Sequence, residues 1–212
     1  MPELTIGLIE IVLLLFSITV HEFFHGYIAE KFGDDTARLM GRLTLNPLAH
    51  IDLFGTILLP LLAIITHMPV FGWAKPVPVD PYKLNNPKRD MMFVGIAGPL
   101  SNFGVAVGSS FCLWILKSFS VFLYLIPVFN YLLTINIILA VFNLIPIPPL
   151  DGSQILKGIL PARISYEYDK LIPFGFLIIL FLLTSGLLWY ILGPVVSYLI
   201  RWLGVGPSAL II

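Results

Sequence analysis

The sequence predicts an all-α polytopic membrane protein, because its residues are mostly apolar and because the apolar residues gather in long runs. Of the 212 residues, 58% are hydrophobic and 11% are charged, whereas soluble domains are about 45 to 50% apolar and about 25% charged. Runs at 4–28, 91–116, 121–145 and 171–200 meet or exceed the roughly 20 residues that cross a hydrocarbon core. We expect about five or six transmembrane helices in a single integral membrane domain over residues 1–212.

The first run, 4–28, is predicted to be a retained helix rather than a signal peptide. No basic residues precede it, and it continues far beyond the length of a signal-peptide core. Its second half also carries His21, Glu22 and His25, which a signal peptide would not contain. These three side chains are therefore expected to lie inside the membrane domain.

The short apolar segment 53–65, which contains Gly55 and Pro60, decides the expected topology. If it is re-entrant, eleven of the twelve Lys and Arg residues share one side and Lys117 lies alone on the other. If it spans, four lie on one side and eight on the other. The positive-inside rule favours a re-entrant segment, with the basic side in the cytoplasm. Both counts take the last run as two short helices that turn at 184–186 and return.

The segment 69–87 is rich in proline and contains alternating valines. This composition predicts a short strand-like loop or extended loop near the cytoplasmic face rather than a helix. Two interpretations stay open: a solvated connector, or a strand-like platform that pairs with an extended substrate.

The first helix carries a metal-binding pattern. Its residues His21, Glu22, Phe23, Phe24 and His25 form H-E-x-x-H, and on a helix both imidazoles project from one face, one turn apart, which suits a zinc ion. Glu22 would then take a proton from a water molecule that the metal activates. The pattern also arises by chance in soluble helices, but such polar groups deep in an apolar helix are costly unless they are paired or bind something.

A third ligand must come from elsewhere in the chain. A metzincin arrangement is excluded because Lys31 stands six residues after His25, and Glu30 is too near on the same helix. Asp151 is the strongest distant candidate, since it follows three prolines that end a helix, and the freed backbone groups should be buried in protein or line a wet cavity. With a re-entrant 53–65, the first and third helices run parallel, and His21, His25 and Asp151 all fall in the cytoplasmic half.

Several motifs together resemble the site-2 protease family of intramembrane metalloproteases. They are HEFFHG at 21–26, NPLAHID at 46–52, FGWAKPVPV at 71–79, GPLSN at 98–102 and NLIPIPPLDG at 143–152. H-E-x-x-H alone is moderately specific, but its pairing with N-x-x-P-x-x-P-x-D-G in a later helix is strong. The resemblance covers most of the chain, from 20 to about 155.

The resemblance implies a zinc-dependent endopeptidase that cleaves transmembrane protein substrates within the bilayer. It implies one Zn²⁺ per chain held by His21, His25 and Asp151, with Glu22 as general base and then general acid. It also implies that Asn143 helps to position or polarise the scissile carbonyl. Asn143 could equally satisfy backbone carbonyls that the helix break frees, and both interpretations stay open.

Other polar or reactive residues have weaker assignments. Asn102 in GPLSN could support a ligand, but helix packing is favoured because Gly98 and Ser101 are small. A turn, cap or interfacial role is favoured over metal ligation for His50 and Asp52. His67 is expected in an interfacial loop and Cys112 in the apolar core.

The sequence also bears on partners and on rival functions. A net charge of zero without a basic run excludes the usual nucleic-acid binders. The resemblance leads us to expect a compact form, without the inserted peptide-binding domain of many relatives and without an apolar helix before the H-E-x-x-H helix. Substrate selection is therefore expected from the bilayer core, the 69–87 loop or an accessory membrane protein, in a prokaryotic cell membrane. A metal or proton transporter and a non-catalytic scaffold are the rivals, and no oligomeric state is indicated.

Overall fold

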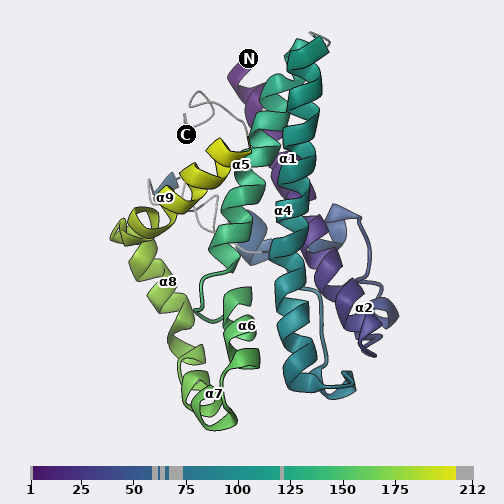
Figure 1. Ribbon diagram of the computed structural model, residues 1–212, viewed down its shortest axis with the longest axis vertical. Helices are drawn as coiled ribbons and strands as arrows, with labels where there is room; N and C mark the ends of the chain where they lie inside the picture. The colour runs from purple at the N-terminus through teal and green to yellow at the C-terminus, as the bar shows by residue number, and fades with distance from the viewer. Residues whose placement is uncertain (1, 59–61, 63–64, 67–73, 120–121, 204–212) are drawn as a thin grey trace.

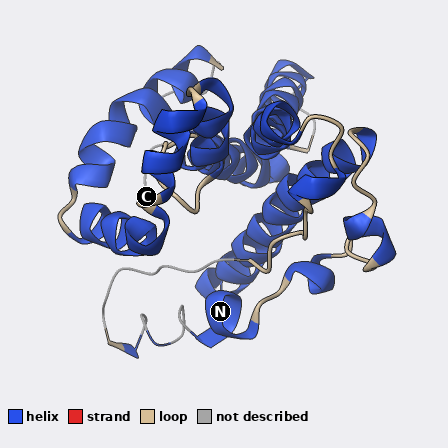
Figure 2. Cartoon of the chain, turned by 90° about the horizontal axis from the view of Figure 1, so that it is seen from below, coloured by secondary structure: helices blue, strands red, loops and turns tan. Residues whose placement is uncertain are grey.

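The computed structural model describes residues 2–58, 62, 65–66, 74–119 and 122–203, and every regular element among them is helical (Figures 1 and 2). The longer helices are α1 (Pro2–Lys31), α4 (Pro87–Phe119), α5 (Ile126–Asn143) and α9 (Leu187–Trp202). The shorter ones are α2 (Thr36–Leu39), α6 (Asp151–Ile159), α7 (Ala162–Asp169) and α8 (Gly175–Thr184). Short 3-10 turns (Pro47–His50, Pro81–Lys83, Leu123–Leu125 and Ile172–Phe174) and a π-helix (Leu53–Leu58) complete the set. The all-α prediction is confirmed.

Three of these helices are long and apolar enough to cross a bilayer: Thr5–Lys31, Pro87–Phe119 and Leu123–Asn143. A fourth span results if Ala162–Thr184 and Leu187–Trp202, which meet at a bend of 77°, are counted as one. The segment 53–65 begins as the π-helix, but most of its remainder, like His67, lies outside the described residues.

The segment 69–87 forms a loop rather than a strand wherever it is described, so of the two predicted forms the loop is the one found. Residues 74–80 form no strand, and a 3-10 turn follows at Pro81–Lys83. Pro76 and Pro78 lack the N–H groups that a strand ladder needs, which accounts for the loop form. Residues 69–73 lie outside the described part.

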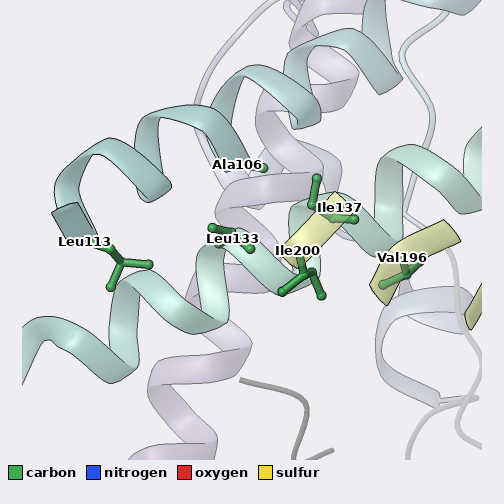
Figure 3. Packing of buried hydrophobic residues seen from close by; sticks show 6 residues of the cluster. All are labelled: Ala106, Leu113, Leu133, Ile137, Val196 and Ile200. Carbon is green, nitrogen blue, oxygen red and sulfur yellow. The ribbon is translucent and has the colours of Figure 1, made fainter. Parts of the chain in front are cut away.

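The helices α1, α4 and α5 pack side by side, with α1 and α5 running in the same direction and α4 in the opposite one (Figure 1). This is the predicted parallel arrangement of the first and third long helices. One half of the bundle is held by an apolar cluster from α4, α5 and α9 (Figure 3), formed by Ala106, Leu113, Leu133, Ile137, Val196 and Ile200. Lipid tails are as apolar as these side chains, so close packing rather than water exclusion stabilises their contact.

The last apolar run divides where the sequence predicted. The helix α8 ends at Thr184, α9 begins at Leu187, and Gly186 between them has φ +74, a left-handed conformation that glycine adopts without strain. The bent pair is either a broken span or a re-entrant loop. Ser110 Oγ donates to Leu203 O, so the end of α9 lies beside the half of α4 that leads to Lys117. This contact places Arg201 toward the Lys117 end of α4.

Candidate metal centre

The two histidines of H-E-x-x-H project from one face of α1, as their spacing predicts. His21 and His25 are both buried, and their Nε2 atoms lie 3.0 Å apart. The rings meet edge to face, with centroids 4.6 Å apart. A single ion between the two Nε2 atoms would therefore contact both rings.

Asp151 is brought to the same point by the turn that follows α5. The proline-rich stretch 144–150 ends α5, and Asp151 is the first residue of α6. Its Oδ2 lies 3.0 Å from His21 Nε2, and its Oδ1 lies 3.3 Å from His25 Nε2. One ligand atom from each residue falls within 4.8 Å of the other two. The structure thus joins the three residues that the sequence proposed as metal ligands.

The partners of the two Nδ1 atoms determine which ring nitrogens face the cluster. His21 Nδ1 lies 2.6 Å from Asn102 Oδ1, and His25 Nδ1 lies 2.7 Å from the Val94 carbonyl oxygen. Both partners accept hydrogen bonds, so each Nδ1 carries a proton, and in the neutral form that binds metal each Nε2 presents a lone pair. This arrangement is typical of histidines that bind metal through Nε2.

A divalent cation fits these residues. In the tautomer that these contacts favour, two Nε2 lone pairs and a carboxylate converge, and the buried Asp151 Oδ2 then has no hydrogen-bond donor. Buried polar atoms without partners are costly, and a cation at their centre would satisfy all of them. Two imidazoles and one carboxylate, with a fourth position open, form the donor set of catalytic zinc sites.

Glycines allow the helices to meet this closely. A Cβ atom at Gly98 on α4 would lie 2.6 Å from His21 Nε2, inside the cluster. A Cβ atom at Gly152 would lie 2.5 Å from the Ile145 carbonyl oxygen, in the turn that carries Asp151. Both positions need glycine for close approach rather than for an unusual backbone conformation.

Glu22 stands beside the cluster and is held by the loop 74–80. Its Oε2 accepts a hydrogen bond of 2.8 Å from Val77 N. The loop is anchored on both sides of this contact, because Lys75 N donates to His50 O at 2.9 Å and Asp80 N donates to Asp34 Oδ2 at 2.6 Å.

The remaining motif residues near this loop have structural contacts. Asp52 Oδ1 accepts from Phe54 N and Gly55 N, which is the turn role favoured for it. His50 is buried, and its Nε2 lies 3.0 Å from Thr44 O, away from the cluster. At the loop's far end a hydrogen bond from Lys83 lowers the pKa of Asp35, and the same contact raises the pKa of Lys83.

The cluster opens into a cavity of about 710 Å³ between α1, α4, α5, α8 and the loop 74–80. Asn143 lines this cavity together with Glu22 and Asp151. Its Nδ2 donates to Leu139 O at 3.0 Å, within its own helix. The position suits a role toward substrate and the bond suits a role in ending α5, so both interpretations stand.

The chain matches a known protein family, and this match shows to which class of protein the site belongs. The model of peptidase family M50 matches residues 9–122 and 115–183, which together make up more than half of the chain and include all the residues of the cluster. The chain belongs to peptidase family M50. Family membership and the donor set together make it a zinc-dependent metalloprotease of the site-2 type in an integral membrane protein.

Individual relatives agree with the family assignment. YwhC of Bacillus subtilis is 36% identical over 193 residues, which cover 88% of this chain and 85% of YwhC. Rip2 of Mycolicibacterium smegmatis is 31% identical, over 83% of this chain and 67% of its own length. Both are named as candidate zinc metalloproteases. The zinc metalloprotease MJ0392 of Methanocaldococcus jannaschii is 27% identical over 73% of this chain but only 35% of its own length. No solved structure matches.

Some groups around the metal cluster were not predicted from the sequence. Asn102 was assigned to packing, yet its Oδ1 contacts His21, and the buried residues Asn136 and Ser17 stand behind it. The signal available was that Asn136 interrupts an apolar run, where a polar residue usually has a partner. The backbone groups of Val94 and Val77 carried no signal, because any residue type supplies them.

Proposed function

We propose that this chain is an intramembrane zinc protease that hydrolyses peptide bonds in or near transmembrane segments of other membrane proteins, as in regulated intramembrane proteolysis. The proposed residues are His21, His25 and Asp151 as zinc ligands, Glu22 as general base and acid, and Asn143 toward the scissile carbonyl. One observation carries the proposal: the three ligand atoms meet beside Glu22 in a cavity between helices that are long enough to span a bilayer.

The walls of the cavity suit a membrane-protein substrate. Its lining includes apolar side chains of α1, α5 and α8, namely Ile18, Leu139, Phe142, Phe176 and Ile179. An apolar side chain of a transmembrane segment can leave lipid for such a surface at little cost.

Zinc, when bound, supplies Lewis-acid chemistry that favours the attack of water on a carbonyl. Glu22 accepts the proton of the attacking water and then delivers it to the nitrogen of the leaving amine. The hydrogen bond from Val77 N orients the Glu22 carboxylate. An Asn143 amide turned toward the carbonyl would stabilise the charge that develops on its oxygen.

The membrane topology of the proposal has the active site toward the cytoplasm of a prokaryotic cell. With Arg201 beside the Lys117 end, the other ten of the twelve Lys and Arg residues remain on the side of the metal cluster, a bias that the positive-inside rule assigns to the cytoplasm. The matched relatives come from bacteria and an archaeon. A re-entrant 53–65, five or six helices in one domain and an accessory membrane partner belong to the same proposal.

The direct test compares the wild type with Glu22→Gln in detergent, using a model transmembrane substrate. The expected result is loss of cleavage with zinc content retained, because the amide removes the base but leaves the ligands. Unchanged cleavage would contradict the proposal. Zinc flux into proteoliposomes that survives Glu22→Gln would instead support a transporter, although ligand atoms within 4.8 Å of one another suit one fixed site better than a path.

A further inference from the structure

Three fully buried polar side chains connect α1, α4 and α5 directly behind His21. Ser17 lies on α1, Asn102 on α4 and Asn136 on α5, and each has 0% of its surface exposed. Polar groups at such depth are retained when each of them finds a partner. Their bonding therefore shows what the group is arranged to do.

All four amide hydrogens of the two asparagines are used. Asn136 Nδ2 donates to Ser17 Oγ and to Leu132 O, both at 2.8 Å. Asn102 Nδ2 donates to Asn136 Oδ1 at 2.8 Å and to Ser17 O at 3.2 Å. Rotating the Asn102 amide by half a turn would break both of its bonds. Its Oδ1 is therefore held toward His21 Nδ1, at 2.6 Å.

The two histidine rings consequently depend on different kinds of support. His21 is oriented by an amide side chain that Asn136 and Ser17 hold in place. His25 is oriented by the Val94 carbonyl, a backbone group that no side-chain substitution removes. Substitutions in the asparagine network therefore affect one imidazole and leave the other unchanged.

We propose that Asn102 is a positioning residue that keeps the proton of His21 on Nδ1. The Nε2 lone pair is thereby directed at the point that His21 shares with His25 and Asp151. Asn136 acts through Asn102. This inference rests on the proposed role of His21 as a zinc ligand. If Asn102 served only in packing, its substitution would still lower the stability of the protein modestly, because it removes hydrogen bonds between membrane helices. A loss of stability therefore does not distinguish packing from positioning. Zinc affinity separates the two roles, because only positioning changes the ligand.

The test measures the zinc dissociation constant by chelator competition in detergent for Asn102→Ala, Asn136→Ala and the double variant. Asn102→Ala is expected to weaken zinc binding about 10- to 100-fold, the usual effect of removing a partner of a ligating histidine. Asn136→Ala should weaken binding less, and should add nothing in the Asn102→Ala background, because its effect passes through Asn102. Ser109→Ala, buried on α4 and bonded within its own helix, is the control and should bind as the wild type.

Asn102→Asp extends the test because it keeps an acceptor for His21 Nδ1 while losing the amide hydrogens. It should bind zinc more tightly than Asn102→Ala, and the visible spectrum of the cobalt-loaded protein should stay closer to the wild type. Wild-type zinc affinity in Asn102→Ala, or an equal effect of Asn136→Ala in both backgrounds, would overturn the positioning role. If Asn102→Ala does not fold, the result for Asn136→Ala decides: zinc affinity equal to that of the wild type in Asn136→Ala would by itself overturn the positioning role.

His21→Ala separates this inference from the proposed function. If His21→Ala binds zinc as the wild type does, the metal site itself is wrong. If His21→Ala loses zinc while Asn102→Ala keeps it, the metal site stands and the positioning role alone is overturned.

Discussion

Gly98 is where the backbone of α4 comes closest to the proposed metal ligands on α1. A Cβ atom there would lie 2.6 Å from His21 Nε2, which is a ring atom and not the end of a flexible side chain that could move aside. Its carbonyl oxygen also accepts from Ser101 Oγ at 2.7 Å, which fixes the local backbone of α4. The absence of a side chain at Gly98 is therefore part of the ligand geometry.

We predict that Gly98→Ala lowers zinc content and reduces cleavage by about 100-fold, because a displacement of reacting groups by about 1 Å has effects of this size. Gly104→Ala is the matched control, since it lies on the same helix and its Cβ would have nothing within 4 Å. Elemental analysis and a cleavage assay check both variants. Full zinc content in Gly98→Ala would contradict the prediction, because it would show that a methyl group at this position does not disturb zinc binding by the histidines.

The two interpretations of Asn143 predict different results for Asn143→Ala. A role toward the scissile carbonyl predicts that kcat falls by about 10²- to 10³-fold while thermal stability changes little. A role in satisfying the end of α5, through its bond to Leu139 O, predicts lower stability with nearly unchanged kcat per folded molecule. We expect the first result, which steady-state kinetics and thermal unfolding in detergent distinguish.

At the scale of elements, the turn that carries Asp151 is clamped by the helices that follow it. Tyr168 OH donates to Pro146 O at 2.8 Å. A Cβ atom at Gly175, the first residue of α8, would fall on the carbonyl oxygen of Pro148 and 2.6 Å from its carbon. Contacts from α7 and α8 therefore hold the turn that leads to Asp151.

We predict that Gly175→Ala weakens zinc binding because it pushes the turn, and Asp151 with it, away from the histidines. Gly193→Ala on α9, where a Cβ has nothing within 4 Å, should behave as the wild type. Zinc competition assays on both variants check this. Equal zinc affinity in the two variants would mean that α8 does not position the ligand turn.

The elements also show which features of the M50 site were predictable from sequence. Proline and glycine mark local breaks, so the end of α5 and the turn at Gly186 were predictable. H-E-x-x-H places His21 and His25 by helix geometry alone. The contact between Asn102 and His21 was not predictable in the same way, because it depends on how α4 is rotated against α1. A helix that is apolar on all sides does not reveal this rotation.

At the scale of the whole molecule, the cavity among the helices constrains what a substrate must do. The backbone of a transmembrane helix is bonded to itself and shielded by its own side chains, so its carbonyls are inaccessible until it unwinds. The cluster lies within the bundle rather than above it, since His21 and His25 belong to the candidate span Thr5–Lys31. Under the proposed function, in which the substrate is a transmembrane segment, the substrate must unwind locally before it is cut.

We predict that cleavage is concentrated near Gly, Pro or Asn residues of the substrate, which weaken a helix. The measurement places such residues singly into an otherwise uniform leucine-rich transmembrane segment and maps the cut sites by mass spectrometry. Cleavage of the unmodified leucine segment at the same rate would show that unwinding is not required.

The most direct measurement for this structure is the zinc content per chain in detergent, after reconstitution with zinc. Three proteins are compared with the wild type: Asp151→Ala, the double variant His21→Ala with His25→Ala, and Asp35→Ala as a carboxylate control away from the cluster. The predicted result is about one zinc in the wild type and in Asp35→Ala, with a clear reduction in the other two. Absence of zinc from the wild type, or zinc that is indifferent to Asp151→Ala and to the histidine variant, would contradict a metal site at this cluster.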